Sequence, residues 1–497
     1  MRTPSLEDAA RMRGFLREAN YSADGLVAAF GHAEPPSPHL RTLPWLLDRT
    51  REESQFHTLV RLFFMNVAVP RETLERTLPA WFADLCRDHG MVSEDAGETR
   101  ATMLINAERE FLIASDPYRR MLSPERLDHV LTVNPTSVHL AQFALRTPVA
   151  TTLDLAAGGG IQALFAADSS TEVLATDLNE RAVAYARFNA RLNGLENIRC
   201  VVGDGFAAAE GRTFDRILCN PPFVLAPALE YLYRDSGMEL DLFCQGLVAE
   251  APAHLNEGGC FQMIFEWVQR EDDPDWQTPL RTWFDGSGCD VWVIKEYTDS
   301  PEDYTQLRLR EVIADGPDAE AELFLRWVES LRQRRVKTIN GGLVLMRRRS
   351  GPTWTRFEAL TEPTDGPFNA AVAGALVRFD FLAAHESDDS LLAARLRLSP
   401  EARVDQRYAV SDRDWRSERI RLRLMAGVPR SVKLAADMAN FLAQLDGSRT
   451  LGEAAEALAK ETGNDPAHVR GEVVRVVRDF MELGFILPED TEAPAEG

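Results

Sequence analysis

The sequence predicts an α/β protein whose central domain, residues 125–350, is built on a mostly parallel sheet of seven strands. Three observations support this fold class. Short apolar runs alternate with helical patterns through the central region, as expected for a sheet covered by helices on both faces. The region before it is mainly helical, and the chain ends in a segment with three capped helices. Its 497 residues are enough for about two to four domains.

Seven apolar runs in the central domain have the length and residue types of buried strands. Helical patterns separate most of them, and a long helical stretch precedes the last. Parallel neighbours need such crossovers, so the pattern indicates repeated strand–helix units. The seven runs are residues 152–155, 172–176, 198–202, 216–219, 261–265, 291–294 and 343–346.

Residues 1–124 are predicted to form a helical N-terminal domain with a small hairpin. Between Phe56 and Phe63, apolar residues recur at the spacing of one helix face. Strand-like runs at residues 102–105 and 111–113 supply the hairpin. Helices combined with such a hairpin are compatible with a winged-helix-like fold.

Residues 351–430 are interpreted as a mixed linker or accessory region. They contain strand-like pieces at Val372–Phe381 and Arg419–Leu424, separated by loops. At the end of the chain, residues 488–497 form an acidic, proline-bearing tail that is expected to be disordered.

Residues 431–487 are predicted to form a winged-helix-like module of three helices. The first is expected from Ser431 to about Leu445. A capping box of Thr450 and Glu453 opens the second helix, and Asp465 caps the third, which begins with a proline.

Composition excludes several classes of protein. The net charge of −22 disfavours a broad nucleic-acid footprint, although a local basic patch can override it. The six cysteines lack CxxC spacing and the nine histidines lack HxH or HExxH spacing, so buried free thiols and no metal are expected. No stretch reaches the ~20 apolar residues that span a bilayer, and no signal peptide is evident. A cytoplasmic protein is therefore predicted; the oligomeric state is not encoded in these patterns.

Three polar positions follow the first three strands of the central domain. The segment Asp154–Gly160, DLAAGGG, forms a glycine-rich turn between a strand and a helix, which lets the backbone approach a ligand closely. Asp177 ends the next strand, where an acid can accept both hydroxyls of a ribose. Asp204, between two glycines after the third strand, can accept an adenine amino group. Taken singly, each is also compatible with an ordinary turn or loop acid.

The fourth strand leads into Asn220-Pro221-Pro222-Phe223. Adjacent prolines fix an extended turn and leave carbonyls that no ladder uses. The Asn220 side-chain oxygen and the Pro221 carbonyl can both accept hydrogen bonds from one amide or amine nitrogen, and Phe223 offers a flat face for stacking. Such a site directs a nitrogen lone pair by positioning and polarisation, without a strong base.

In this order, the four motifs resemble those of class I S-adenosylmethionine-dependent methyltransferases, specifically the small-domain group with an NPP(F/Y) signature. That group includes the HemK-type glutamine methyltransferases of release factors and enzymes that methylate base amines in RNA and DNA. The resemblance covers residues 125–350 and implies a Rossmann-like fold and S-adenosylmethionine as the cofactor. The family's first loop glycine is Ala156 here, whose methyl group penalises a positive φ.

The resemblance also implies roles for individual residues. Asp154, Ala156, Gly158 and Gly160 would line the methionine part of the cofactor, Asp177 would hold its ribose and Asp204 would lie near its adenine. Asn220, Pro221 and Phe223 would hold the target nitrogen, with Asn220 also beside the cofactor.

Three functions follow as alternatives. Methylation of a protein glutamine amide is favoured by the NPPF motif, the acidic surface and the added helical domain. Methylation of an exocyclic base amine in RNA or DNA suits the same grip on an unpaired base, and a basic groove beside Phe223 would favour it. A non-catalytic cofactor-binding or scaffold protein is suggested by Ala156 alone. A small-molecule amine would also fit.

Three further segments have two interpretations each. Residues 231–241 are either a lid over the site or a solvated loop, and residues 133–137 are either a cover for the cofactor or a plain helix cap. The basic concentration between Arg332 and Arg349 is either an RNA contact or, more simply, a solvated face.

Overall fold

A computed structural model describes residues 2–31, 41–122, 126–209, 211–229, 231–310, 316–360, 362, 364, 366, 368–411, 413–425 and 427–489. Contacts divide the chain into two units, residues 1–141 with 147–358, and residues 142–146 with 359–497. Each unit has its own buried apolar core. The predicted acidic tail lies outside the described residues from position 490 onward.

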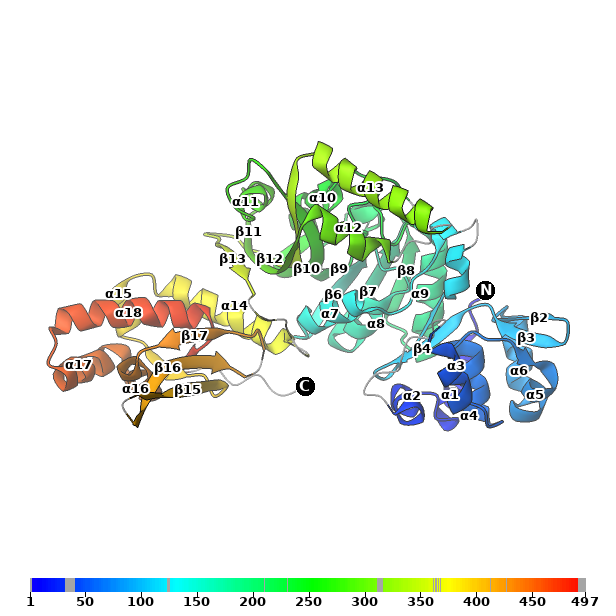
Figure 1. The fold of residues 1–497 in the computed structure, drawn as a ribbon, viewed down its shortest axis with the longest axis horizontal. Helices are drawn as coiled ribbons and strands as arrows, with labels where there is room; N and C mark the ends of the chain where they lie inside the picture. The colour runs from blue at the N-terminus through cyan, green and yellow to red at the C-terminus, as the bar shows by residue number, and fades with distance from the viewer. Residues whose placement is uncertain are drawn as a thin grey trace. The chain divides into compact units, whose positions relative to one another are not determined.

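The first unit contains a sheet in the order β13-β11-β12-β10-β9-β6-β7-β8, and Figure 1 shows this order across it. All seven predicted strands belong to it, but the predicted count of seven is wrong because β13 adds an eighth. That strand is half-exposed at the edge and has no apolar run, so sequence periodicity does not reveal it. The strands are β6 (Val149–Leu155), β7 (Ser170–Asp177), β8 (Ile198–Val202), β9 (Phe214–Cys219), β10 (Leu255–Arg270), β11 (Cys289–Asp299), β12 (Val336–Arg348) and β13 (Thr355–Ala359).

Strand direction makes this a mixed sheet. The ladders from β8 through β7, β6 and β9 to β10 are parallel, and β12 is antiparallel to both β10 and β11. From β6 the chain first proceeds to β7 on one side and later to β9 on the other. Ligands bind at such a switch point, outside the carboxyl ends of the strands.

Helices cover both faces of the sheet. Val173 and Ala175 of β7 pack with Ala163 and Ala186, whereas Leu174 between them packs in the cluster that contains Val248. Because successive strand residues point to opposite faces, α8 and α9 lie on one face and α10 on the other. The helices are α7 (Pro135–Phe143), α8 (Ile161–Ala166), α9 (Glu180–Asn193), α10 (Leu242–Glu250), α11 (Thr278–Phe284), α12 (Pro301–Leu309) and α13 (Pro317–Gln333).

The N-terminal region is helical and carries a three-stranded sheet in the order β1-β3-β2, followed by the hairpin β4–β5. Its winged-helix character stays a prediction. The elements are α1 (Leu6–Glu18), α2 (Ala23–Phe30), α3 (Leu43–Arg49), α4 (Gln55–Leu59) with a π-helical turn over Val60–Phe64, β1 (Val69–Pro70), α5 (Arg71–Thr77), α6 (Ala80–Asp88), β2 (Val92–Asp95), β3 (Glu98–Ala101), β4 (Leu104–Glu108) and β5 (Phe111–Ser115).

The N-terminal region and the large sheet share one apolar core through α9. Tyr185 and Phe188 of α9 are buried in the same cluster as residues of α1 and α6. The Asn193 side chain accepts from the Leu112 amide at 2.9 Å and donates to the Leu112 carbonyl at 2.8 Å. The hairpin β4–β5 is therefore fixed to the helix that follows Asp177.

The second unit combines helices with two small sheets, β18-β14-β19 and β15-β16-β17. Both sheets contain strands from either side of residue 430, so no structural boundary falls there. The elements are α14 (Asn369–Ala384), α15 (Asp388–Leu392), β14 (Arg395–Leu398), β15 (Ala402–Ser411), β16 (Asp414–Leu424), β17 (Ser431–Leu434), α16 (Ala436–Ala443), β18 (Asp446–Thr450), α17 (Leu451–Thr462), α18 (Pro466–Glu482) and β19 (Ile486–Pro488).

Two local predictions in this unit are wrong. Val372–Phe381, expected to be strand-like, lies within helix α14, which buries Val372, Leu376 and Phe379. The helix expected from Ser431 begins later, because residues 431–434 pair with β16 as strand β17. The capping box of α17 and the Asp465 cap of α18 are confirmed.

Several expected absences concern only the residues that the structure describes. There, no group of three His, Cys, Asp or Glu side chains is arranged to hold a metal ion. In the same part of the chain, no helix combines the length and apolar character needed to cross a membrane. All six cysteines are buried free thiols, as predicted.

Candidate functional site

A cavity of about 360 Å³ lies at the carboxyl ends of β6, β7, β8 and β9. Most of the predicted cofactor residues line it, and Gly160 lies just behind the lining as the N-cap of α8. Pro221 and Phe223 line a neighbouring cavity instead. The predicted residues that line the first cavity are Asp154, Ala156, Gly158, Asp177, Asp204 and Asn220.

The turn after β6 uses three left-handed residues, Ala156 (φ +57°), Gly158 (φ +54°) and Gly160 (φ +80°). The expected conflict at Ala156 is therefore real: an L-residue there costs roughly 1–2 kcal/mol compared with a right-handed conformation. At Gly160, a Cβ would come within 3.0 Å of the Ala186 Cβ. Glycine at that position thus lets α8 start directly against α9.

Asp177 ends β7 and closes the turn. Its Oδ2 accepts from the Gly158 amide and its Oδ1 from the Asn179 amide, both at 2.8 Å. Burial raises the pKa of its carboxyl group. Each oxygen keeps a second lone pair, so the carboxylate can accept further hydrogen bonds from a diol in the cavity.

Asp154 lies within β6, fully buried at the cavity wall, where its Oδ2 accepts from the Ala163 amide at 2.8 Å. Burial raises the pKa of its carboxyl group to about 8, and the nearby charge of Asp177 adds to the rise. Two buried carboxyl groups in one cavity favour a ligand that brings positive charge. S-adenosylmethionine carries positively charged sulfonium and ammonium groups, and it therefore fits a cavity lined by these two carboxyl groups.

Asn189, in the middle of α9, was not predicted to contribute. Its Oδ1 accepts from the Ala114 amide at 2.7 Å, and its Nδ2 donates to the carbonyls of Ala114 at 3.0 Å and Gly159 at 2.9 Å. It therefore ties the glycine turn to strand β5. An amide within a helix whose neighbours are apolar was the available signal in the sequence.

The segment before α7 also contributes to the cavity. The Asn134 side chain accepts from the Ser137 amide at 2.9 Å, and the Ser137 carbonyl accepts from Gln162 Nε2 at 2.8 Å. All three residues line the first cavity. This segment is thus a helix cap that also forms part of the cavity wall.

Asn220 lies where the first cavity meets a second one of about 750 Å³. The residues that line both are Leu131, Asn134, Asn220 and Tyr233. Pro221 is buried and Phe223 half-buried on the wall of the second cavity. A group held by Asn220 therefore faces both spaces.

A buried hydrogen-bond network supports the turn that contains Phe223. The Tyr304 hydroxyl accepts from the Leu225 amide at 2.9 Å and donates to Glu266 Oε2 at 2.6 Å. Arg308 is ion-paired with the same Glu266, and its guanidinium lies 5.8 Å from the centre of the Phe223 ring. Burial, with Glu266 beside it, raises the pKa of Tyr304 far above its ordinary value, so the hydroxyl stays a donor.

The second cavity is basic and aromatic. No Asp or Glu occurs among the described residues that line it. Arg234 is paired with Asp235 at 2.8 Å, whereas Arg119 and Arg310 have no ion-pair partner within the described part of the chain. The charged and aromatic lining residues are Arg119, Arg234, Arg308, Arg310, Tyr118, Phe223 and Tyr233.

The segment 231–241, for which a lid was one interpretation, faces both spaces. Tyr233 lines both cavities, Arg234 the second, and Asp235, Ser236 and Met238 the first. Arg234 and Asp235 are buried. This part of the segment is therefore cavity wall.

Comparisons with known proteins agree with this geometry. Residues 132–273 match the family model described as the methyltransferase small domain, while residues 18–102 and 373–488 match two models described as domains of unknown function. The predicted family and cofactor, S-adenosylmethionine, are confirmed for this central segment.

Curated relatives include two release factor glutamine methyltransferases. That of Cereibacter sphaeroides is 34% identical over 144 residues, which is 26% of this chain and 51% of the relative. That of Xylella fastidiosa strain 9a5c is 30% identical over 193 residues, 36% of this chain and 61% of the relative. The chain thus spans about half to three-fifths of the length of these relatives. Among solved structures, the YcgJ protein of Bacillus subtilis has a TM-score of 0.29 and 15% identity, covering 44% of this chain and 98% of its own.

We expect Asp177→Ala to weaken binding of S-adenosylmethionine at least ~10-fold, because hydrogen bonds to a charged group contribute about 1.5–3 kcal/mol. Isothermal titration calorimetry measures the affinity. Glu180→Ala is the matched control, since it removes one exposed acid nearby that does not line the cavity. Unchanged affinity in Asp177→Ala would contradict the assigned role.

The raised pKa of Asp154 predicts a pH-dependent stability of the cofactor-free protein. A folded-state pKa of about 8 lies above the ordinary value of 3.8, so the folded state holds the proton more tightly than the unfolded state. The contribution of Asp154 to stability is then fully present below its ordinary pKa and is lost as the pH rises towards 8. Thermal unfolding is measured from about pH 5 to 8. Over this range, the unfolding temperature of Asp154→Asn should decrease less than that of the natural protein. Equal decreases in unfolding temperature for the two proteins would refute this prediction.

Proposed function

We propose that this protein, whose residues 132–273 form an S-adenosylmethionine-dependent methyltransferase domain, methylates a planar nitrogen held by Asn220, Pro221 and Phe223. One observation carries the proposal: Asn220 lies where the cavity lined by the acids meets a second cavity that contains Phe223. The two cavities provide separate spaces for a methyl donor and an acceptor, with Asn220 between them.

The chemistry of this site is positioning. The bound cofactor supplies an electrophilic methyl group. The Asn220 side-chain oxygen and the Pro221 carbonyl accept the N–H bonds of the target, which increases electron density on nitrogen and directs its lone pair. Phe223 holds the planar group by stacking. The nitrogen that receives the methyl group then releases one N–H proton to solvent, so neither Asn220 nor Pro221 has to act as a strong base.

The basic lining of the second cavity supports an exocyclic amine of a base in RNA or DNA as the target. Arg119 and Arg310 are cationic groups in the wall that contains Phe223. Aromatic stacking together with arginines is the combination that holds an unpaired base and its phosphates. This is the basic groove beside Phe223 that would favour a base over a protein amide.

A protein glutamine amide is the second candidate. The names of the relatives, release factor glutamine methyltransferase, favour it. The amide of glutamine is planar and has two N–H bonds, so it satisfies the same acceptors. The basic cavity would then hold an acidic part of the protein substrate.

The basic concentration between Arg332 and Arg349 does not strengthen the nucleic-acid alternative. Arg332 is paired with Glu302 at 2.6 Å, Arg334 with Glu239 at 2.9 Å and Arg335 with Asp272 at 2.7 Å. In each pair, the acid neutralises the charge of the arginine. A solvated face is therefore preferred for Arg332, Arg334 and Arg335, whereas Arg347 and Arg349 pair with the buried Asp290.

Transfer of a labelled methyl group into an extract from cells that lack the protein tests the function. We expect label that nuclease removes and protease does not. Asn220→Ala should lower its incorporation at least ~100-fold, the scale for losing one positioned polar group, while leaving cofactor affinity unchanged. Label removed by protease instead would favour the glutamine amide. Natural turnover in Asn220→Ala would contradict the proposed role of the residue.

Arg310→Glu tests the basic cavity separately. We expect KM for the nucleic-acid substrate to rise at least ~10-fold with little change in kcat, because the exposed arginine contacts phosphate and not the reacting nitrogen. The slope of log affinity against log salt should decrease by about one, because one phosphate contact is lost. Arg326→Glu is the control, an exposed arginine of α13 outside both cavities. Equal KM values for the two variants would exclude a phosphate contact at Arg310.

A further inference from the structure

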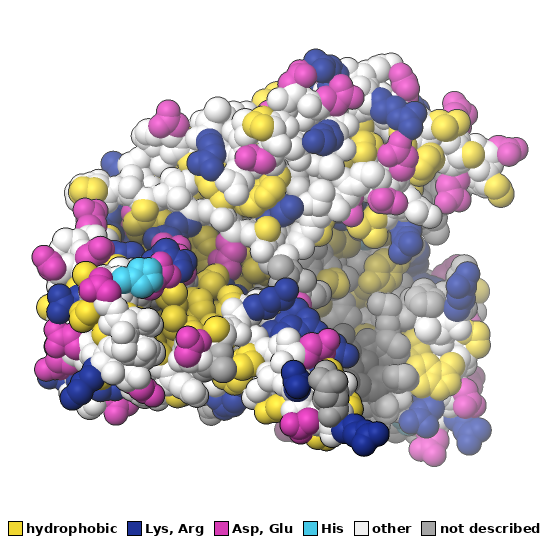
Figure 2. Space-filling model, turned by 60° about the vertical axis from the view of Figure 1, so that its left-hand side comes forward, with side chains coloured by type: hydrophobic (Ala, Val, Ile, Leu, Met, Phe, Trp, Pro, Cys, Tyr) yellow, Lys and Arg dark blue, Asp and Glu magenta, His cyan; other side chains and the backbone are white. Residues whose placement is uncertain are grey.

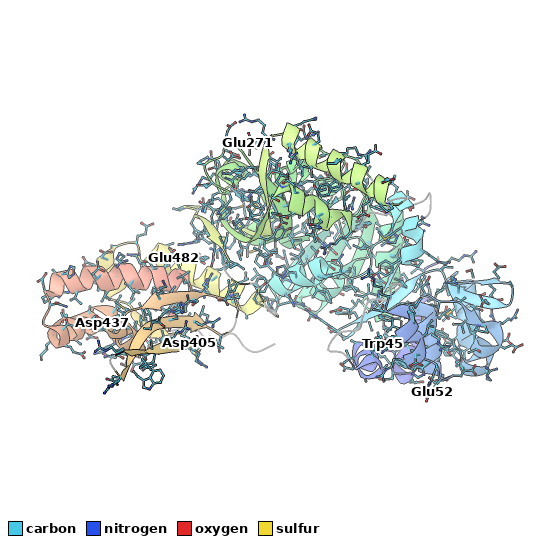
Figure 3. All side chains as sticks on the ribbon, in the orientation of Figure 1. Trp45, Glu52, Glu271, Asp405, Asp437 and Glu482 are labelled. Atoms are coloured by element: carbon cyan, nitrogen blue, oxygen red, sulfur yellow. The ribbon has the colours of Figure 1, made fainter. Side chains whose placement is uncertain are left out.

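The hairpin β15–β16 in the second unit extends beyond its apolar core. Residues 403–410 and 413–418 are exposed on both strands, and burial begins only near Ile420 and Leu422. A hairpin exposed on both faces gains little from burial, so its sequence is free to serve contact with a partner. Figure 3 labels Asp405 on this hairpin.

Pairing register separates the hairpin into two faces. Residues of β15 pair with β16 without interruption from Ala402 to Arg407, and a bulge then shifts the partner of Tyr408 to Ser417. Since successive side chains alternate, one face collects the cations and is called the basic face. It consists of Arg403, Arg407, Arg416, Arg419, Arg421, Arg423 and, from β17, Lys433, together with Asp405 and Asp414.

The opposite face is apolar. It begins at the buried Ile420 and Leu422 and continues towards the turn with exposed side chains. Trp415, beside the turn, is 67% exposed and Tyr408 is 51% exposed. The hairpin therefore presents arginines on one side and exposed aromatic rings at its end.

Several cations on the basic face stand directly opposite each other. The register pairs Arg403 with Arg423, Arg407 with Arg419, and Arg421 with Lys433. Like charges at directly opposed positions destabilise a sheet. Among the described residues, acids offset part of this repulsion. Asp405 stands directly opposite Arg421, Arg423 lies 3.2 Å from Glu362 and 3.5 Å from Asp405, and Arg407 lies 3.5 Å from Glu418.

This accumulation of cations contrasts with the net charge of the chain. The protein as a whole has a net charge of −22, and on the face shown in Figure 2 acidic and basic side chains are largely interspersed. A surface that retains repulsive pairs within an acidic protein is complementary to a polyanion. Alternate residues of a strand are about 6.6–6.8 Å apart, so the cations form rows, which suits charges repeated along one chain.

We propose that the basic face of hairpin β15–β16 binds the phosphate backbone of RNA or DNA. The choice of a nucleic acid over another polyanion rests in part on the proposed function, because the catalytic cavity is also lined by arginines and aromatic rings. Binding at the hairpin is independent of methyl transfer and is measured without it.

Fluorescence anisotropy with a labelled single-stranded RNA or DNA of about 20 nucleotides, at about 0.1 M salt, tests the proposal on the full chain without cofactor. Replacing Arg403, Arg407 and Arg419 by glutamine should weaken binding at least ~10-fold and reduce the slope of log affinity against log salt by about two. The matched control replaces Lys460, Arg470 and Arg475, exposed cations of α17 and α18, by glutamine. Its affinity should stay within about two-fold of the natural protein.

Thermal unfolding of the hairpin variant provides a second readout. Because two opposed like-charge pairs are removed, the variant should unfold at a temperature no lower than the natural protein, so weaker binding cannot be ascribed to loss of the fold. Equal loss of binding in the control variant would overturn the proposal, as would binding of the natural protein to phosphatidylserine vesicles but not to RNA or DNA. Binding is measured without cofactor, so nucleic-acid binding by the natural protein without methylation of any base would refute the proposed function and leave the hairpin proposal intact.

Discussion

The register of the parallel ladders around β6 is the constraint on which the site depends. Leu155 of β6 is paired with Thr176 of β7 on one side and with Cys219 of β9 on the other. The next residue along each strand therefore emerges at the same level, which brings Ala156, Asp177 and Asn220 to one edge. A shift by one residue in either ladder would turn these side chains to the opposite face. Covalent order alone, with more than forty residues between Asp177 and Asn220, does not bring them together.

Buried polar groups then hold the loops that the ladders bring together. Asn189 satisfies backbone groups of β5 and the glycine turn, and Glu266 accepts from Tyr304 and Tyr297, at 2.6 Å and 2.7 Å, and pairs with Arg308. Burying such groups costs free energy unless each is hydrogen-bonded. Both networks end at turns that line the cavities. The buried polar groups therefore lie where irregular backbone has to be held in one conformation. The left-handed Ala156 belongs to the same category of local strain.

The residues that line the first cavity could be selected from the sequence, but the residues that hold them in place could not. Local signals were sufficient for the glycine turn, for Asp177 and for Asn220, since each follows an apolar run. They were insufficient for Asn189 and Glu266, whose partners lie 75 and 38 residues away. They also failed where a strand or helix depends on its neighbours: β13 needs the edge of β11, β17 needs β16, and the apolar segment in α14 has no period that distinguishes helix from strand. Sequence patterns show which side chains are present, whereas strand pairing and packing determine which of them lie together in one site.

The basic hairpin illustrates the same limit for charge. Its arginines are separated along the chain by apolar and acidic residues, so no basic run marks them, and only the antiparallel register collects them on one face. The net charge of −22 predicts a surface that repels phosphate. At about 0.1 M salt, however, exposed charges more than ~10 Å apart hardly influence each other. A polyanion close to the hairpin or to the second cavity therefore encounters the local arginines, and the overall acidity of the protein acts mainly against non-specific contacts elsewhere on its surface. Acidic composition and selective nucleic-acid binding are thus compatible in one chain.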